Sequence, residues 1–510
     1  MAEHSNYVRR MLEVMAANPE RPVMWWRGEP VTAEGVTDAV TTAARSLFRL
    51  GDQARIVGVL TVTNSPDTLI LRYAVNLAGA TVVHLQTTNA VDPGNRMAVD
   101  DVLDLLVKAG VSVLAVDEDN AEVGRQLRDR LAGPLRLVAL RPLGDDVLDL
   151  STGGSAQLPV DVDPDAVAAV THTSGTTGRP KGIAVTFRSR SEIVDAAAAA
   201  GATDTVYLSA LPISHSSGGL LDGTLASGGA VVLHETFDPG EVLRTIALRR
   251  VNHLFVSPPQ LYRLLDHEDL AGTDRSSLGM LVYAGCAAAP ARLAEAVTKL
   301  GPVLYQIYGT AEAGMISMLA AVDHVDPELR TTVGRPVGEV RIRDEHDGHD
   351  LPVGEIGEIC ARTSFTMQGY WRDPELTARV VRDGWVHTGD LGRLDERGYL
   401  RIHGRMGEMI KTKGIKVYPA TVEHALLGHP QVAQAAVFGV SDADRVEHIH
   451  AAVVLRRDAT ATAGDLRAHV TAELSVEHAP VVVDLLAALP LSANGKPDKL
   501  RLVAAATAGV

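Results

Sequence analysis

Short apolar runs alternate with longer helix-like stretches over most of the chain, and this alternation restricts the fold more than any other feature of the sequence. Strands that alternate with helices usually build parallel sheets. The sequence therefore predicts an α/β fold with two such series, at residues 22–150 and 165–322. The runs expected as strands include 56–62, 81–85, 111–116, 230–234, 253–256 and 280–284, and the stretch 33–50 is expected as a helix.

The pattern changes after Gly334, where short apolar segments are separated by frequent glycine turns. Such a pattern is typical of a small barrel or β-subdomain. A mixed α+β pattern returns near Arg405. Since 510 residues exceed what one hydrophobic core usually serves, we expect two or more domains.

Charge and composition exclude several classes of protein. A formal net charge of −15 argues against a general binder of nucleic acids or anionic membranes, because those surfaces are held mainly by clustered Lys and Arg. The chain shows no signal peptide and no apolar run long enough to span a membrane. Cys286 and Cys360 have no CxxC spacing, which suggests neither a disulfide framework nor a thiolate zinc site and favours a cytoplasmic location.

Two histidine-containing segments resemble metal sites but have simpler explanations. His448 and His450 alternate as on a strand. Residues 344–350 (DEHDGHD) are typical of a polar hairpin tip. We therefore expect structural roles for both.

Residues 173–182 (TSGTTGRPKG) follow the apolar run 166–170, where a strand would lead into a loop. Glycines let the backbone approach phosphate oxygens, hydroxyls donate hydrogen bonds to them, and Lys181 supplies positive charge. The Walker A pattern GxxxxGK[ST] is absent. A flexible Ser/Thr/Gly turn is the alternative to a phosphate-binding loop. The candidate phosphate ligands are Thr173, Ser174, Gly175, Thr176, Thr177, Gly178 and Lys181.

This segment resembles the phosphate-binding signature TSGTTGxPKG of the ANL superfamily, which contains acyl- and aryl-CoA synthetases, peptide-synthetase adenylation domains and luciferases. Further segments resemble motifs of that superfamily in the same order over nearly the whole chain. They are 211–215 (LPISH), 284–290 (AGCAAAP), 308–312 (YGTAE), 384–390 (GWVHTGD), 404–419 (GRMGEMIKTKGIKVYP) and 490–496 (PLSANGK).

The resemblance implies a fold and an activity. The fold is a large N-terminal domain of two αβα subdomains and a β-barrel subdomain at residues 1–404, and a small mobile α+β domain at 405–510. The hinge is expected near 405–408, at Gly407. The activity is that of a bacterial acyl-CoA synthetase, which uses ATP, Mg²⁺ and coenzyme A to form an acyl-AMP and then a thioester.

The resemblance also assigns roles in nucleotide binding and catalysis. Glu312 is a hard oxygen ligand suited to Mg²⁺, and Asp390 is suited to the ribose hydroxyls. Lys496 would stabilise the negative charge that develops when a carboxylate attacks the α-phosphate. The remaining nucleotide-binding candidates are Gly285, Cys286, Ala287, Tyr308, Gly309, Thr310 and Arg405.

Two further regions follow from the resemblance. After adenylation the C-terminal domain would rotate and present residues 411–416 as a tunnel for the thiol, formed by Lys413, Gly414 and Lys416. His215 would close the acyl pocket, although a structural histidine is a serious alternative. The acyl pocket is expected to be lined by the small residues Ser216, Gly218, Gly219, Ser257, Ala313 and Gly314, which favours a bulky, largely apolar acid.

Three positions depart from the superfamily pattern. Ala311 replaces the threonine of YGxTE, Gly407 replaces the usual acidic or lysine hinge residue, and His172 replaces the usual aromatic residue before TSG. A lost hydrogen bond to a charged group costs about 1.5 to 3 kcal/mol. One hypothesis is therefore that the enzyme performs the thioester half-reaction better than ATP-driven adenylation.

Several alternatives remain open at this stage. The chain is expected to act as a monomer or homodimer on a carboxylic acid or an acyl-AMP, and the expected context is specialised metabolism. It could load carrier-protein phosphopantetheine in place of coenzyme A, or it could be an inactive nucleotide-binding protein. An amino-acid substrate is less favoured, with Asp222 as the only candidate partner for its ammonium group.

Overall fold

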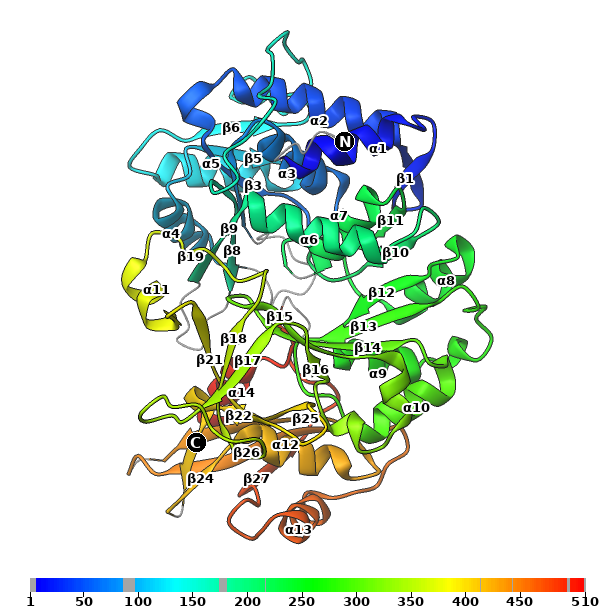
Figure 1. Ribbon diagram of the computed structural model, residues 1–510, viewed down its shortest axis with the longest axis vertical. Coiled ribbons are helices and arrows are strands. Elements are labelled where there is room, and N and C mark those ends of the chain that lie inside the picture. The colour runs from blue at the N-terminus through cyan, green and yellow to red at the C-terminus, as the bar shows by residue number, and fades with distance from the viewer. Residues whose placement is uncertain are drawn as a thin grey trace.

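The computed structural model describes residues 6–85, 97–173, 181–215, 217–412, 414–442, 444–492 and 496–508. Two large mixed sheets with their helices come first along the chain, followed by a β-rich unit and a C-terminal α+β unit at the bottom of Figure 1. The predicted α/β class is confirmed, and the strands expected at 56–62, 81–85, 230–234, 253–256 and 280–284 are present within one or two residues of their expected ends. Among the described residues, no helix has the length and hydropathy needed to cross a membrane.

The first sheet has eight strands in the order β19-β9-β8-β4-β3-β5-β6-β7. Strands β8, β4, β3, β5, β6 and β7 are parallel, as the βα alternation predicts. The edge strand β19 comes from much later in the chain and pairs with β9. The strands are β3 (Ile56–Leu60), β4 (Thr81–His84), β5 (Val113–Val116), β6 (Arg136–Ala139), β7 (Val147–Asp149), β8 (Val167–Thr173), β9 (Lys181–Thr186) and β19 (Gly369–Tyr370).

The second sheet has nine strands in the order β16-β15-β14-β13-β12-β10-β11-β1-β2. Its centre is parallel and rich in Val, Leu and Ile, since both faces are covered. The strands are β1 (Pro22–Trp26), β2 (Glu29–Thr32), β10 (Val206–Ser209), β11 (Ala230–Leu233), β12 (His253–Val256), β13 (Met280–Ala284), β14 (Leu304–Thr310), β15 (Gly314–Leu319) and β16 (Arg335–Pro336).

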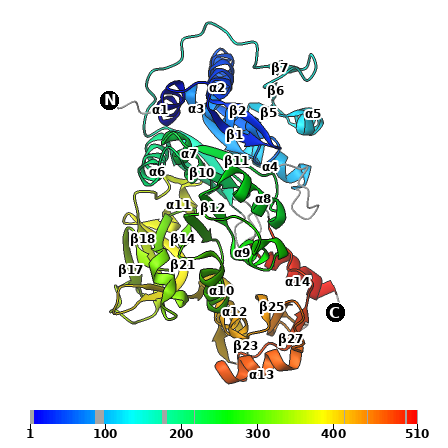
Figure 2. The same ribbon diagram turned by 90° about the vertical axis from the view of Figure 1, so that its right-hand side faces the viewer.

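Helices between the two sheets join them into one packed body. Helix α3 packs on β3 and β4, α7 packs on β10 and β11, and α1 contacts α3, α6 and α7 (Figure 2). The largest core cluster accordingly contains side chains from both sheets. The helices of this part are α1 (Tyr7–Ala16), α2 (Ala33–Phe48), α3 (Pro66–Leu77), α4 (Val99–Ala109), α5 (Ala121–Arg130), α6 (Phe187–Ala200), α7 (Ser217–Ala226), α8 (Pro239–Arg249), α9 (Pro258–Leu265) and α10 (Pro290–Leu300).

Local sequence signals explain where several helices begin. Ser65 accepts a hydrogen bond from the backbone N–H of Thr68 ahead of α3, and Asp238 caps α8 in the same way. Proline occupies the first turn of both helices, where its missing N–H costs nothing. These caps fix the loops that lead from strand to helix.

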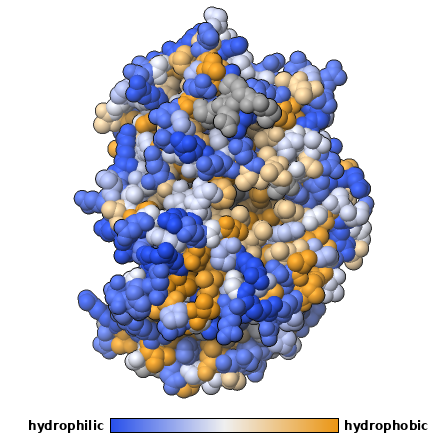
Figure 3. All heavy atoms as spheres, viewed as in Figure 1, coloured by the Kyte–Doolittle hydropathy of each residue, from blue (hydrophilic) through white to orange (hydrophobic). Residues whose placement is uncertain are grey.

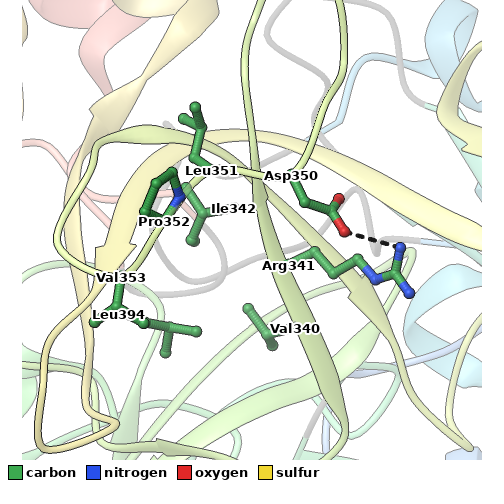
Figure 4. Close-up of a pocket in the computed structure, with 8 residues that line it drawn as sticks. All are labelled: Val340, Arg341, Ile342, Asp350, Leu351, Pro352, Val353 and Leu394. Atoms are coloured by element: carbon green, nitrogen blue, oxygen red, sulfur yellow. Dashed lines mark hydrogen bonds and ion pairs between the residues drawn. The ribbon is translucent and has the colours of Figure 1, made fainter.

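The glycine-rich segment after Gly334 forms an antiparallel sheet in which β18 and β22 flank β21, as expected for a β-subdomain. A surface pocket of about 180 Å³ lies beside β17, and the residues of the Arg341–Asp350 ion pair form part of its lining (Figure 4). The elements are β17 (Glu339–Arg343), β18 (Gly357–Arg362), α11 (Pro374–Val380), β20 (Val381–Arg382), β21 (Trp385–Leu394) and β22 (Leu400–Arg405).

The C-terminal unit contains a hairpin and a three-stranded sheet. Helix α12 packs against α10, and Arg456 lies 3.5 Å from Glu295, so this unit rests on the second sheet's helical layer. Hydrophobic residues gather in the lower half of the face shown in Figure 3. The elements are β23 (Ile410–Thr412), β24 (Ile415–Val417), α12 (Pro419–Gly428), β25 (Val432–Ser441), β26 (Glu447–Leu455), α13 (Ala463–Glu473), β27 (Val482–Leu485) and α14 (Lys499–Ala508).

Candidate active site

The predicted phosphate loop connects two described strands. Thr173 ends β8 and Lys181 begins β9, and the two residues pair across the antiparallel ladder. The predicted phosphate ligands Ser174, Gly175, Thr176, Thr177 and Gly178 lie outside the described residues, as do the predicted site residues Ser216 and Lys413. Strand β8 therefore leads directly into the predicted phosphate-binding segment, as the apolar run before that segment predicts.

Tyr370 links the predicted magnesium ligand to the predicted phosphate lysine. Its hydroxyl donates a 2.6 Å hydrogen bond to Oε1 of Glu312, and Nζ of Lys181 lies 5.7 Å from the centre of its ring. Burial and the neighbouring carboxylate raise the pKa of Tyr370, which keeps it a donor. Tyr370 was missed in the sequence because only the pairing of β19 with β9 brings it here.

The predicted ribose ligand lies in a compact hydrogen-bonded group. Asp390 is 7% exposed, and its Oδ2 accepts 2.8 Å from the hydroxyl of Tyr308. Its Oδ1 accepts 2.8 Å from Nε of Arg405, which is the direct cross-strand neighbour of Asp390 on β22. Burial and the carboxylate of Asp390 raise the pKa of the Tyr308 hydroxyl. The structure thus brings together three residues predicted from separate motifs.

Lys496 lies against Gly285, one of the predicted nucleotide-binding residues of the segment 284–290. Gly285 follows β13 with φ of +103°, and a Cβ atom there would come within 3.0 Å of Cε of Lys496. Burial lowers the pKa of Lys496, the charge of Arg405 acts in the same direction, and the carboxylates of Asp390 and Glu312 oppose them. Lys496 therefore interacts electrostatically with the predicted ribose ligand Asp390 and with the predicted magnesium ligand Glu312, although its side chain is exposed to solvent.

The remaining predicted nucleotide residues shape loops next to this group. Cys286 is partly exposed and Ala287 is exposed, and burial raises the pKa of Cys286 to about 12, so its thiol stays protonated. The Thr310 hydroxyl accepts 3.1 Å from the backbone N–H of Ala313. A Cβ atom at Gly309 would lie only 2.1 Å from the carbonyl oxygen of Gly314, so glycine is required where the ladder is irregular.

His215 lies in a loop that Asn64 holds in place. The Asn64 amide donates 2.9 Å to the carbonyl of Leu211, and its oxygen accepts 3.0 Å from the N–H of Ile213. Nδ1 of His215 lies 2.9 Å from the Ser214 hydroxyl. Burial lowers the pKa of His215 to about 4, with a further contribution from Lys496. The ring is therefore neutral at physiological pH, and Asn64 is a positioning residue that the motif comparison missed.

Close packing explains most of the small residues predicted to line the acyl pocket. A Cβ at Gly218 would come within 2.1 Å of the Ile213 carbonyl, and one at Gly219 within 2.8 Å of Ile193 on α6. A Cβ at Gly314 would clash with Phe365 at 2.5 Å. Ala313 and Ser257 are also buried, at 0% and 1% exposure. Their size is therefore a requirement of the fold and says little about the bulk of the acid.

Asp222 is unavailable to an amino-acid substrate. It is 0% exposed and forms ion pairs with Arg72 and Arg190. Its Oδ1 also accepts 2.6 Å from the hydroxyl of Tyr73. Because the carboxylate is fully buried and both of its oxygens already accept from protein donors, an ammonium group of a substrate has no access to it.

The predicted thiol-tunnel segment forms the β23–β24 hairpin. Gly414 has φ of +80° at its turn, where a left-handed conformation favours glycine. Nζ of Lys416 lies 3.5 Å from Glu345 in the loop after β17. Gly407 is exposed and a Cβ atom there would meet nothing within 4 Å, so the fold does not require glycine at this position.

The strand and the hairpin predicted for the histidine segments are present, but Asp344, Asp347 and His349 bring potential metal-ligand atoms within 4.8 Å of one another. His448 and His450 lie on β26, and residues 344–350 connect β17 to β18. Glu358, Cys360 and His387 come together in the β-rich unit, where Nδ1 of His387 lies 2.7 Å from Glu358.

Two family models match most of the chain and identify the class of protein. A family model described as "AMP-binding enzyme" matches residues 12–371, and one described as "AMP-binding enzyme C-terminal domain" matches residues 421–496. The chain belongs to the AMP-binding enzyme family. The ANL resemblance and its fold are confirmed.

Individual relatives agree with this family. The chain is 33% identical to a medium/long-chain-fatty-acid–CoA ligase, FadD8, of Mycobacterium tuberculosis, over 96% of this chain and 88% of the relative. It is 34% identical to a feruloyl-CoA synthase of an Amycolatopsis species, over 88% and 87%. The solved structure of the amide bond synthetase McbA from Marinactinospora thermotolerans is similar with a TM-score of 0.85 and 35% identity, covering 98% of each chain.

Proposed function

We propose that this AMP-binding enzyme is an acyl-CoA synthetase. A carboxylate oxygen of the acid attacks the α-phosphorus of ATP, and the bond to pyrophosphate breaks, which gives an acyl-AMP. The thiolate of coenzyme A then attacks the acyl carbonyl, and AMP leaves with the electron pair of the C–O bond. The similarity to a fatty-acid ligase and a feruloyl-CoA synthase supports a bulky, largely apolar acid.

The position of Lys496 carries this proposal. It lies against Gly285, within electrostatic reach of Glu312 and Asp390. An ammonium group held there can stabilise the charge that develops on the α-phosphate oxygens. Glu312 would hold Mg²⁺, with Tyr370 fixing its carboxylate, and Asp390 would exchange its protein donors for the ribose hydroxyls.

Rotation of the C-terminal part provides the second half-reaction in this proposal. We place the junction between domains at residues 404 and 405 and the pivot at Gly407, where the open surroundings leave the backbone free to turn. Rotation would withdraw Lys496 and break the exposed Lys416–Glu345 pair, whose loss costs about 1 kcal/mol or less. Lys413, Gly414 and Lys416 would then line the path of the thiol.

The test measures each half-reaction separately. Purified protein is incubated with ATP, Mg²⁺, coenzyme A and a panel of carboxylic acids, and AMP and acyl-CoA are quantified by chromatography. Equal amounts of both are expected with bulky acids. Thioester formation only from synthetic acyl-AMP would show that the enzyme performs only the second half-reaction, as the replacement by Ala311 suggests. Activity only with short acids such as acetate would contradict the proposal of a bulky substrate. No product from any acid or acyl-AMP would disprove the enzyme proposal.

A second candidate acceptor is an amine. The similarity to the McbA amide bond synthetase over 98% of both chains favours this possibility. Replacing coenzyme A by a panel of amines, or by a phosphopantetheinylated carrier protein, separates the three acceptors. The cytoplasmic location and the monomeric or homodimeric state stay predictions from the sequence.

A further inference from the structure

A small buried cavity lies between the two sheets, next to the segment that carries His215. Helices α1, α3 and α6 contribute Tyr7, Arg72 and Arg190 to its wall, and the loop before α7 contributes Ser214. The cavity measures about 20 Å³, enough for one small group such as a water molecule or an oxygen atom. Figure 1 shows α1, α6 and α7 side by side in the upper half of the molecule, as their contacts require.

The charges around the cavity do not balance. Arg72 and Arg190 both pair with the single carboxylate of Asp222, which leaves one positive charge in excess among the charged groups that meet there. Arg72 is 2% exposed and its Nε has no hydrogen-bond partner among the described residues. A buried charge without a full set of partners is costly, so this site favours an additional acceptor.

The histidine on the opposite wall responds to the same excess charge. Burial lowers the pKa of His84 well below its usual range, and the positive charges of Arg72 and Arg190 lower it further. Because His84 is neutral, it adds no positive charge to the cavity, and the excess charge comes from the arginines alone. The potential in the cavity is therefore positive, which suits an oxygen that carries negative or partial negative charge.

The cavity shares a wall with the predicted acyl pocket. Nη1 of Arg72 donates 3.0 Å to the carbonyl of Ile213 and would lie 3.1 Å from a Cβ atom at Gly218. Ile213 and Gly218, which lie on either side of His215 in the chain, are therefore both next to Arg72. An acid that extends past His215 along this segment would reach the arginines with its far end.

We propose that the cavity receives an acceptor oxygen, of a ketone or a carboxylate, at the end of the acid substrate remote from the reacting carboxyl group. This inference rests on the proposed function. It defines the substrate class as a bulky acid with a second oxygen function, and it makes Arg190 a specificity-determining residue. Arg190 is the more accessible of the two, with 14% of its side chain exposed against 2% for Arg72.

The test compares acids of equal chain length that differ only at the far end: an alkanoic acid, the corresponding keto acid and the α,ω-dicarboxylic acid. The wild-type kcat/KM for at least one oxygenated acid is expected to exceed that of the alkanoic acid by about tenfold to a hundredfold, the range for one hydrogen bond to a charged donor. Arg190→Met leaves the Arg72–Asp222 pair neutral. It is expected to remove this preference while kcat/KM for the alkanoic acid changes little.

Controls separate recognition from stability. Arg10→Met removes an exposed ion pair with Asp195 on α6, the helix that also carries Arg190, and should leave the preference intact. Arg190→Lys keeps the charge and should retain part of the preference. If wild-type protein forms AMP from these acids without preferring an oxygenated one, the inference is wrong and the proposed function survives. If Arg190→Met lowers the rate for every acid equally, the residue is structural and the inference is also wrong. No AMP from any acid is a failure of the proposed function itself.

Discussion

Two aspartates in this molecule have nearly the same partners and different surroundings. Asp390 accepts hydrogen bonds from a tyrosine and an arginine, and Asp222 accepts from a tyrosine and two arginines. The arginine beside Asp390 has 40% of its side chain exposed, whereas Arg72 beside Asp222 has only 2%. Water or a ligand can therefore replace the partners of Asp390, while those of Asp222 are fixed by the fold.

This difference separates binding from stability. A carboxylate whose partner can be solvated is free to exchange that partner for ribose hydroxyls at small cost. A carboxylate that pairs with two enclosed guanidinium groups cannot be removed without leaving more buried charge unpaired. The Asp390 group is therefore suited to ligand binding, and the Asp222 group holds together helices that belong to two sheets.

The largest expected effect is on stability, at Asp222. Asp222→Asn keeps the shape of the side chain but leaves Arg72 and Arg190 without a counter-charge, so we expect a loss of about 3 to 5 kcal/mol in the free energy of unfolding. Urea unfolding followed by tryptophan fluorescence measures it. Asp390→Asn should cost less than half as much because Arg405 can be solvated. Asp195→Asn, which breaks the exposed pair with Arg10, should cost about 1 kcal/mol or less. Similar losses for all three variants would contradict the distinction.

The next effect is on catalysis, at Lys496. Lys496→Ala removes the ammonium group next to the Asp390 group and should lower acid-dependent pyrophosphate exchange by about a hundredfold to a thousandfold, the cost of losing one preorganised charge stabiliser. Thioester formation from synthetic acyl-AMP should change little. Lys108→Ala, at an exposed lysine paired with Asp104, provides the control and should leave both rates unchanged. An equal loss in both half-reactions would show that Lys496 stabilises the fold and has no specific role in adenylation.

Sequence reasoning located the Asp390 group and missed the Asp222 group for a physical reason. Asp390, Tyr308 and Arg405 each lie in a motif whose residue types suit a nucleotide, so their chemistry is visible in short segments. Asp222 and Arg72 are far apart in the chain, and only the fold, in which α1 contacts both α3 and α7, makes them partners. The strands were predictable from their apolar runs, but nothing in those runs indicates that β19 joins the first sheet and brings Tyr370 to Glu312.

A smaller effect is expected at Tyr370. Tyr370→Phe removes one hydrogen bond to the carboxylate of Glu312, which should weaken Mg²⁺-dependent pyrophosphate exchange by about tenfold to a hundredfold. The loss should shrink as Mg²⁺ concentration rises, because the hydroxyl acts through the metal ligand. Tyr399→Phe removes a similar bond to Asp323, 3.1 Å long and outside the site, and should leave the Mg²⁺ dependence unchanged. A loss that is independent of Mg²⁺ would show that Tyr370 supports only the fold.

The smallest effect is the pH dependence of stability that His215 contributes. Burial holds its pKa at about 4 in the folded protein, below the value of about 6.5 expected in the unfolded chain. Between these values the unfolded state binds the proton and the folded state does not, so the free energy of unfolding falls as the pH is lowered, by about 1.4 kcal/mol per pH unit at most. His215→Gln should reduce the slope of stability against pH between about 6 and 4.5, measured by urea unfolding at several pH values. If the slope of His215→Gln equals that of wild type, the ring is already protonated in the folded state. In that case burial and the positive charge of Lys496 would not be enough to keep the His215 ring neutral.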